Sequence, residues 1–148
     1  MTFRNPLAAL VVSASIFGCT TSTNQMVTIP LVATSRNAGQ IANTIMVSQG
    51  NQTGFSFTIS GVSSGVTLPL RLYTFINKGS CQQSGPVAYE LNDQVVTQRS
   101  AIRGWTYSRN APVAMSVLLT GDYSIVVRTA PASGNVDIFC GDIRQAAR

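Results

Sequence analysis

Apolar and polar side chains alternate along the stretch Leu68 to Gln82, which reads LPLRLYTFINKGSCQ. A period of two is typical of a β-strand, because successive side chains of a strand point to opposite faces of the sheet. The stretch therefore predicts a strand over residues 68–76, followed by a turn over residues 77–80. One face of this strand would carry Leu68, Leu70, Leu72, Thr74 and Ile76.

Further short apolar stretches follow along the chain, with turn-forming Gly, Asn, Pro and Ser residues between them. No stretch sustains the helical period of about 3.6 residues. Many short strands at close intervals are typical of a β-sandwich or barrel, so the chain predicts an all-β protein. The further strands are expected over residues 26–33, 41–48, 54–60, 87–91, 94–98, 113–119, 123–129 and 136–140.

Residues 1–18 have the layout of an export signal, with a positively charged start at Arg4 and an apolar stretch over residues 7–17. The tripeptide IFG then precedes Cys19 and resembles the lipobox of bacterial lipoproteins. We predict cleavage before Cys19 and acylation of this residue, which anchors a protein stably when more than one acyl chain is attached. The alternative is an ordinary signal peptide followed by a stray cysteine.

The remaining chain would consist of a polar tether over residues 19–25 and a single β-domain over residues 26–148, because no internal linker divides it. Thr20 stands where inner-membrane lipoproteins of enterobacteria carry an aspartate. The lipoprotein resemblance therefore predicts anchoring at the outer membrane, with the domain facing the periplasm or the cell surface.

Only 10% of the residues are charged, 45% are hydrophobic, and the formal net charge is +5. Folded domains usually contain about 25% charged residues. The basic residues are spread along the chain without a cluster, which argues against nucleic-acid binding. A mildly basic surface suits an acidic protein or an anionic component of the envelope.

The chain has three cysteines. If Cys19 is acylated, Cys81 and Cys140 are the one pair left, and an oxidising periplasm predicts a disulfide between them. In the chain-entropy model this bond contributes on the order of 4 kcal/mol, because it closes a loop of about 60 residues. The alternative is two free, buried thiols.

The strand that leads into the pentapeptide KGSCQ resembles the copper–zinc superoxide dismutases, especially those of the bacterial periplasm. The segments CQQSGPV after that strand, SIVVR at residues 124–128 and IFCGDI around Cys140 are also similar to segments of this family, in the same order. The resemblance covers residues 55–143. It implies a Greek-key β-sandwich or flattened barrel, and it independently supports the disulfide between Cys81 and Cys140.

Four histidines hold the copper of these dismutases, and the matching positions here are Thr74, Ile76, Val87 and Arg128. The whole chain contains no histidine, and none of these four side chains offers an imidazole nitrogen. Asp137 stands where the family has an arginine that guides superoxide. We therefore expect a vestigial metal site without metal or other cofactor, and no superoxide dismutase activity.

A second group of residues combines arginine, tyrosine and the one tryptophan of the chain, a composition common at interface hot spots. This candidate binding surface consists of Arg103, Trp105, Tyr107 and Arg109; the alternative is a tryptophan in the core beside solvated arginines. Arg128 is expected to pair with an acid rather than to bind an anion, because an unpaired buried arginine is costly.

These patterns together predict a non-catalytic envelope lipoprotein that binds another envelope component or serves as a structural module. The alternatives are a periplasmic enzyme inhibitor, similar to the lysozyme inhibitors, and an envelope enzyme of another type. Ser84 and Gly85, followed by Tyr89, weakly resemble the serine–glycine–tyrosine motif of one inhibitor group, with the tyrosine displaced. An inhibitor should present an exposed loop, whereas an interaction module should present a broad apolar patch.

Overall fold

The computed structural model describes residues 25–145. No helix in this part of the chain is both long enough and apolar enough to cross a membrane. The regular elements are β1 (Met26–Ala33), η1 (Ser35–Asn37), β2 (Ala42–Gln49), β3 (Gln52–Ile59), β4 (Leu72–Gly79), β5 (Ser84–Glu90), β6 (Gln98–Arg99), β7 (Trp105–Ala111), α1 (Met115–Thr120), β8 (Tyr123–Thr129), η2 (Pro131–Ser133) and β9 (Asp137–Asp142).

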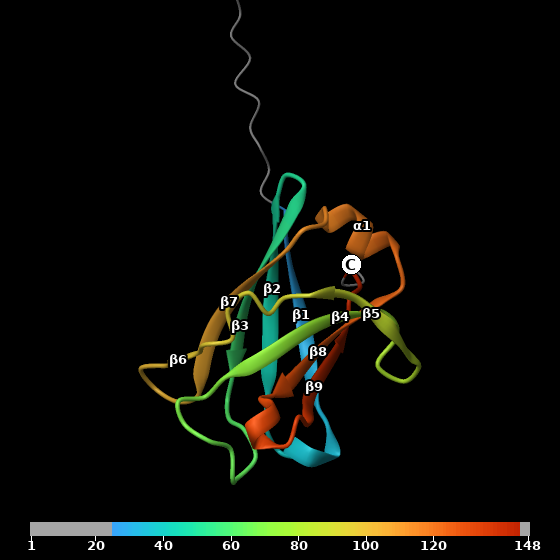
Figure 1. Ribbon diagram of the computed structural model, residues 1–148. Coiled ribbons are helices and arrows are strands. Elements are labelled where there is room, and N and C mark those ends of the chain that lie inside the picture. Colours follow the sequence, from blue (N-terminus) through green and yellow to red (C-terminus); the bar gives the residue numbers. More distant parts are fainter. Residues whose placement is uncertain (1–24, 146–148) are drawn as a thin grey trace, which may run out of the picture.

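The strands form one antiparallel sheet in the order β5-β4-β8-β9-β1-β2-β3-β7-β6. The sheet curls into a half-barrel, and in Figure 1 the β4–β8–β9 half lies in front of the half that contains β1, β2 and β3. The two halves are joined where Val32 and Ala33 of β1 pair with Cys140 and Phe139 of β9. The all-β class predicted from the sequence is therefore confirmed.

Inward-facing side chains of both halves fill one apolar core. Phe57 of β3 is 1% exposed and stacks on Tyr107 of β7, with ring centroids 4.5 Å apart. From the other half, Ile76 of β4, Ile125 of β8 and Phe139 of β9 are completely buried. The core therefore depends on strict alternation along the strands, with every second side chain directed inward.

The alternation predicted for β4 is confirmed over most of its length, because Leu72, Thr74 and Ile76 are all buried. Leu68, by contrast, is 70% exposed and precedes the strand, together with Pro69, whose nitrogen has no hydrogen to donate to a ladder. β4 continues to Gly79, so residues 77–79 belong to the strand and not to the predicted turn.

Most other strand predictions agree closely with the structure. β1 and β8 have the predicted bounds, and β2, β3, β5 and β9 lie within three residues of them. The strand predicted over residues 94–98 is largely wrong, because β6 contains Gln98 and Arg99 alone. Residues 93–97 instead cross between the sheet halves, where Val96 forms an isolated bridge with Arg71.

The strand predicted over residues 113–119 is wrong, because Met115–Thr120 form the helix α1. Met115 and Leu118 are buried on one face of this helix, and Ser116 and Val117 are exposed. Their three-residue spacing is helical. Residues 113, 115, 117 and 119 are also all apolar, so this short stretch satisfies both the strand and the helix pattern.

The predicted disulfide between Cys81 and Cys140 is confirmed, with the two Cα atoms 5.9 Å apart. Cys140 lies on the outer face of β9, opposite to the buried Phe139. The bond therefore ties the loop between β4 and β5 against the outside of the sheet. The backbone N–H of Cys81 also donates to Oδ1 of Asp142 at 2.7 Å.

Three predictions concern residues that the structure does not describe. The signal sequence, the acylated Cys19 and residues 20–24 of the tether precede the described part, and residues 146–148 follow it. Export, lipid anchoring and the outer-membrane location therefore stay predictions.

Candidate functional site

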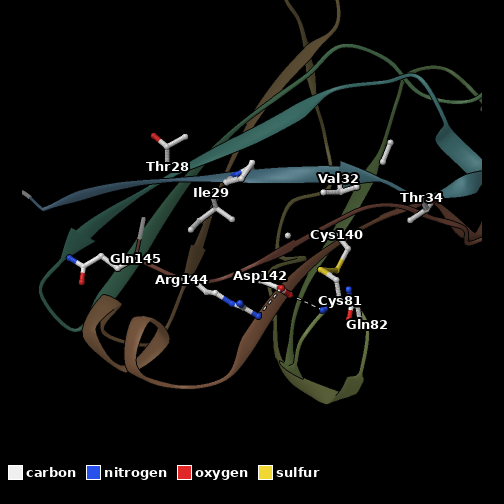
Figure 2. Close-up of a pocket in the computed structure, with 13 residues that line it drawn as sticks. Thr28, Ile29, Val32, Thr34, Cys81, Gln82, Cys140, Asp142, Arg144 and Gln145 are labelled. Carbon is white, nitrogen blue, oxygen red and sulfur yellow. Dashed lines mark hydrogen bonds and ion pairs between the residues drawn. A yellow bond between two sulfur atoms is a disulfide. The ribbon is translucent and has the colours of Figure 1, made fainter. Parts of the chain in front are cut away.

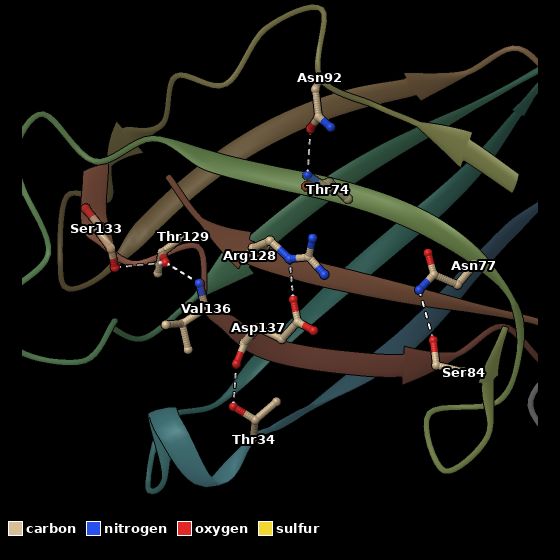
Figure 3. A network of polar contacts seen from close by, with 10 residues as sticks. All are labelled: Thr34, Thr74, Asn77, Ser84, Asn92, Arg128, Thr129, Ser133, Val136 and Asp137. Atoms are coloured by element: carbon tan, nitrogen blue, oxygen red, sulfur yellow. Dashed lines mark hydrogen bonds and ion pairs between the residues drawn. The ribbon is translucent and has the colours of Figure 1, made fainter. Parts of the chain in front are cut away.

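The four positions that match the copper ligands of the dismutases do not form a cluster. Thr74 and Ile76 point into the core and are completely buried, whereas Val87 is 47% exposed and Arg128 lies on the outer face of β8. In Figure 3 the backbone N–H of Thr74 donates to Oδ1 of Asn92, at 2.7 Å. Thr74 and Ile76 therefore lie on the inner face of the sheet, and Arg128 lies on the outer face.

The ion pair expected for Arg128 is present, but it lies on the outer face of the sheet and not at a buried arginine. Its Nε donates to Oδ1 of Asp137, and its guanidinium lies 4.9 Å from the ring centroid of Phe75 (Figure 3). The hydroxyl of Thr34 donates to the main-chain oxygen of Asp137 at 2.7 Å. The two charged side chains are 30% and 46% exposed, so the pair stabilises the fold by about 0.2–1 kcal/mol.

The prediction of a continuous binding surface around Trp105 is wrong. Tyr107 and Arg109 are 6% and 5% exposed, because alternate residues of β7 point into the barrel. Trp105 is half-buried, and the guanidinium of Arg99 lies 4.6 Å from its ring centroid. Arg103 is exposed in the turn before β7. The alternative prediction, in which the arginines are solvated, is also wrong for Arg109.

The outer side of β1, β2, β3 and β7 carries no charged side chain in any of its strand positions. Charged residues are depleted at the centres of protein interfaces, so such a face is a candidate contact surface. We call it the uncharged face; it consists of Met26, Thr28, Pro30, Val32, Asn43, Ile45, Val47, Gln49, Gln52, Gly54, Ser56, Thr58, Thr106, Ser108 and Asn110.

The two sides of the uncharged face differ in character. On β1 and β2 it is largely apolar, with Met26 68%, Val32 72% and Ile45 38% exposed. On β3 and β7 it carries hydroxyl groups, which lie in rows because hydrogen-bonded neighbours in a sheet point the same way. One row crosses the sheet through Thr28, Ile45, Ser56 and Ser108, and the next through Pro30, Asn43, Thr58 and Thr106.

A groove of about 660 Å³ runs along the β1 side of this face, at the seam between the two halves of the sheet. Figure 2 shows Val32 of β1 near the disulfide, and the ion pair of Arg144 with Asp142, 3.0 Å long, farther along the groove. Pro30 also lines the groove. Because proline has no N–H, it cannot donate to a β1–β9 ladder, and the pairing of these strands is limited to Val32 and Ala33 of β1.

A second cavity, of about 390 Å³, lies at the β7 edge of the uncharged face and is lined by Arg109 and Tyr107, among others. Burial lowers the pKa of the Arg109 guanidinium, an effect that the nearby Tyr107 opposes. Burial also raises the pKa of the Tyr107 phenol, against the opposing effects of its hydrogen bond with Thr74 and of the Arg109 charge. Burial thus disfavours the charged form of each group.

The acidic residues of the described segment do not gather into a metal site. Between residues 25 and 145, no three His, Cys, Asp or Glu side chains lie where they could hold a metal ion together. Asp137 and Asp142 each pair with an arginine instead.

Comparison of the chain with protein-family models, with curated proteins and with solved structures gave no match. Function must therefore be inferred from the residues and their arrangement. The uncharged face is the main feature that the sequence motifs did not reveal. Its signal is present in the alternation of residues 26–33, 41–48 and 54–60, where every outward position is uncharged. The remaining strand of the face, β7, is not among the predicted strands, because the composition of Arg103, Trp105, Tyr107 and Arg109 predicts a binding surface instead.

Proposed function

We propose that this protein is a non-catalytic binding module of the bacterial envelope, held at the outer membrane by acyl chains on Cys19. The observation that carries this proposal is the uncharged face, which extends over four strands and exposes Met26, Val32 and Ile45. Its partner is an envelope protein or polymer rich in hydroxyl and amide groups. The apolar patch expected of an interaction module supports this choice.

The binding argument follows from the cost of removing water. Burying an unpaired charge at an interface is expensive, whereas hydroxyl and amide groups need only find hydrogen-bond partners. Covering the apolar side chains of β1 and β2 stabilises the complex by roughly 25 cal/mol for each Å² of apolar surface removed from water. The uncharged face therefore combines a hydrophobic contribution with groups that give specificity.

We further propose that the fold is that of a copper–zinc superoxide dismutase without metal ligands. The strand beside β3 is β7 and not β4, because the chain crosses from β3 to the other half of the sheet before it returns, and such a long connection is typical of a Greek key. The disulfide from the loop after β4 to β9 is the one that the resemblance implies. Because the chain contains no histidine, this framework would serve as a scaffold for binding rather than for redox chemistry.

Placing a charge on the uncharged face should weaken binding strongly without unfolding the protein. We expect Ile45→Lys to weaken binding to envelope fragments by at least about tenfold, because an unpaired charge buried at an interface costs more than about 2 kcal/mol. The measurement is the amount of purified protein retained by sedimented envelope fragments. The melting temperature should stay within a few degrees of the wild type, since Ile45 is 38% exposed.

The matched control is Val117→Lys on α1, where a β-branched side chain is 46% exposed outside the uncharged face. This variant should bind as well as the wild type. Equal binding by Ile45→Lys and Val117→Lys would show that the uncharged face is not the contact surface.

One observation favours a second function, inhibition of an envelope enzyme such as lysozyme. Ile102 is 97% exposed in the turn between β6 and β7, next to Arg103, and could enter the cleft of a target. In contrast, Ser84 and Gly85 lie within β5 and not in a loop. If the protein is such an inhibitor, wild-type protein lowers the rate of cell-wall lysis by lysozyme and Ile102→Asp does not; an unchanged rate excludes this function for lysozyme.

A further inference from the structure

Every second residue of β1 directs its main-chain groups away from β2. The N–H of Ser48 donates to the oxygen of Gln25 at 3.3 Å, and Gln25 thereby starts the series of residues that hydrogen-bond to β2. In an antiparallel pair such residues alternate with residues whose N–H and C=O groups point to the opposite edge. Met26, Thr28 and Pro30 therefore direct these groups toward β9.

This second edge of β1 is largely unpaired. β9 pairs with it at Val32 and Ala33 alone. The next position of the same series is Pro30, which has no N–H, and the one after it places Thr28 opposite Arg144. No main-chain hydrogen bond joins Thr28 to Arg144. Thr28 therefore has an N–H and a C=O at this edge that no ladder of the described strands uses.

The unpaired part of the edge begins beyond Pro30. A Cβ atom added to Gly141 would lie only 2.7 Å from the Pro30 oxygen, so β9 packs directly against β1 at that point. Thr28 and Arg144, two positions farther along each strand, are both exposed. The free main-chain groups of Thr28 are therefore within reach of another molecule.

The groove of about 660 Å³ follows this edge. Thr28 lines it from β1, and Arg144 lines it beyond the end of β9 (Figure 2). Its volume falls within the range of small-molecule sites. Ile29 and Val32 give the groove apolar walls, and the charges of Arg144 and Asp142 already pair with each other at 3.0 Å. The groove thus combines free main-chain groups with apolar side chains and offers no unpaired charge.

We propose that this groove binds an extended segment of an envelope protein, which adds a strand to the free edge of β1. An extended peptide presents an N–H and a C=O to one side at every second residue, which is the arrangement that Thr28 can pair with. The segment carries uncharged side chains, because its neighbours on the outer face include Met26, 68% exposed, and Val32, 72% exposed. A lipid chain has no donor or acceptor for Thr28.

The sequence of β1 favours such pairing. Unpaired main-chain groups at a sheet edge are a template for another strand, and many proteins prevent this with charged side chains on the edge strand. β1, with the sequence MVTIPLVA, contains no charged residue. Pro30 stops the β1–β9 ladder and thereby leaves Thr28 free. This inference rests on the proposed function, since Met26, Thr28 and Pro30 belong to the uncharged face, and it specifies an extended polypeptide as the partner.

The test uses the full-length protein, purified in detergent, and a synthetic seven-residue peptide that alternates valine and serine. Before the peptide is added, the Thr28 amide should exchange its hydrogen at least about tenfold faster than the Ile29 amide, which faces β2. The peptide should then bind saturably, shift the NMR signals of residues 26–30 most, and slow exchange at Thr28. A protected Thr28 amide in the free protein, or no peptide binding in the millimolar range, would overturn the proposal.

The matched control probe is the same peptide with N-methyl groups on its backbone nitrogens. It keeps the side chains and loses the donors, so it should not bind. Equal binding of the two peptides would contradict recognition through the main chain. A concentration-dependent dimer of the free protein that Thr28→Pro abolishes would assign the edge to a second copy of this chain, and would overturn the proposal as well.

A pair of variants tests the edge of β1 itself. Thr28→Pro removes the free N–H and should lower the affinity for the valine–serine peptide at least about tenfold, whereas Thr28→Val keeps this N–H and should bind within about twofold of the wild type. The proline breaks no β1–β2 hydrogen bond, because the N–H of Thr28 faces the other edge. Equal affinities of the two variants would contradict the site. If Thr28→Pro does not fold, the N-methylated peptide decides.

The proposed function fails separately from this inference. Ser108→Lys charges the uncharged face on β7, three strands away from β1, and should weaken binding to envelope fragments while the affinity for the valine–serine peptide stays unchanged. A weaker peptide affinity in Ser108→Lys would contradict a site at the β1 edge. If Ser108→Lys weakens envelope binding but the wild type binds no peptide, this inference alone is rejected. If the peptide binds at Thr28 but Ser108→Lys and Ile45→Lys both retain full envelope binding, the proposed function is rejected and the edge site stands.

Discussion

Phe57→Ala lowers the free energy of unfolding by about 4 kcal/mol, the size expected when a large aromatic side chain is removed from a core. Phe57 is 1% exposed and stacks on Tyr107, with the two rings 5° from parallel. The variant therefore loses buried apolar area and an aromatic contact, and leaves a cavity between β3 and β7. Urea denaturation monitored by circular dichroism measures the change.

The control is the neighbouring residue, Thr58→Ala. Thr58 is exposed on the uncharged face, so its replacement should change the free energy of unfolding by no more than about 0.5 kcal/mol. The contrast between adjacent residues tests which face of β3 points inward. Similar effects of Phe57→Ala and Thr58→Ala would contradict the alternation on which the uncharged face depends.

Removal of the disulfide is the second change with a large expected effect. The double variant Cys81→Ser/Cys140→Ser should lose about 4 kcal/mol of stability in the chain-entropy model, since 59 positions separate the two cysteines. That is a large share of the roughly 5–15 kcal/mol that stabilises a typical domain. The loop between β4 and β5 would be released from the outer face of the sheet, where Asn77 and Ser124 are buried.

Reduction of the wild-type protein provides the matched control. A thiol reductant should lower the stability of the wild type to that of the double variant and should leave the double variant unchanged. A wild-type protein whose stability does not respond to reductant would show that the Cys81–Cys140 bond contributes little to the folded state.

The sequence alone predicts the all-β class because most strands alternate clearly. β8 (YSIVVRT) has its predicted bounds, because turn-forming residues precede it at Gly121 and Asp122. α1 was predicted as a strand, since a six-residue helix offers too few residues to separate a period of two from a helical one. The sequence predicts the pairing of Cys81 with Cys140, because the expected export to an oxidising compartment and the resemblance to the dismutases both indicate it.

The candidate site was less accessible to sequence reasoning. The chemistry of Trp105, Tyr107 and Arg109 predicts a surface, yet alternate residues of β7 point inward, and Tyr107 and Arg109 are buried. Equally, Thr74 and Arg128 match ligand positions in one family, but strand alternation places them on opposite faces. Which face of a strand is buried depends on its neighbours in the sheet, and neither composition nor local motifs contain that information.

Site-specific cross-linking in living cells tests the proposed binding surface most directly. A photoreactive amino acid is introduced at Ile45 or Ser108 of the uncharged face, or at Val117 on α1, and the cells are irradiated. If the uncharged face binds an envelope component, the first two positions give the same cross-linked product and Val117 does not. Cross-links from Val117 alone, or equal cross-links from all three positions, would contradict the proposal.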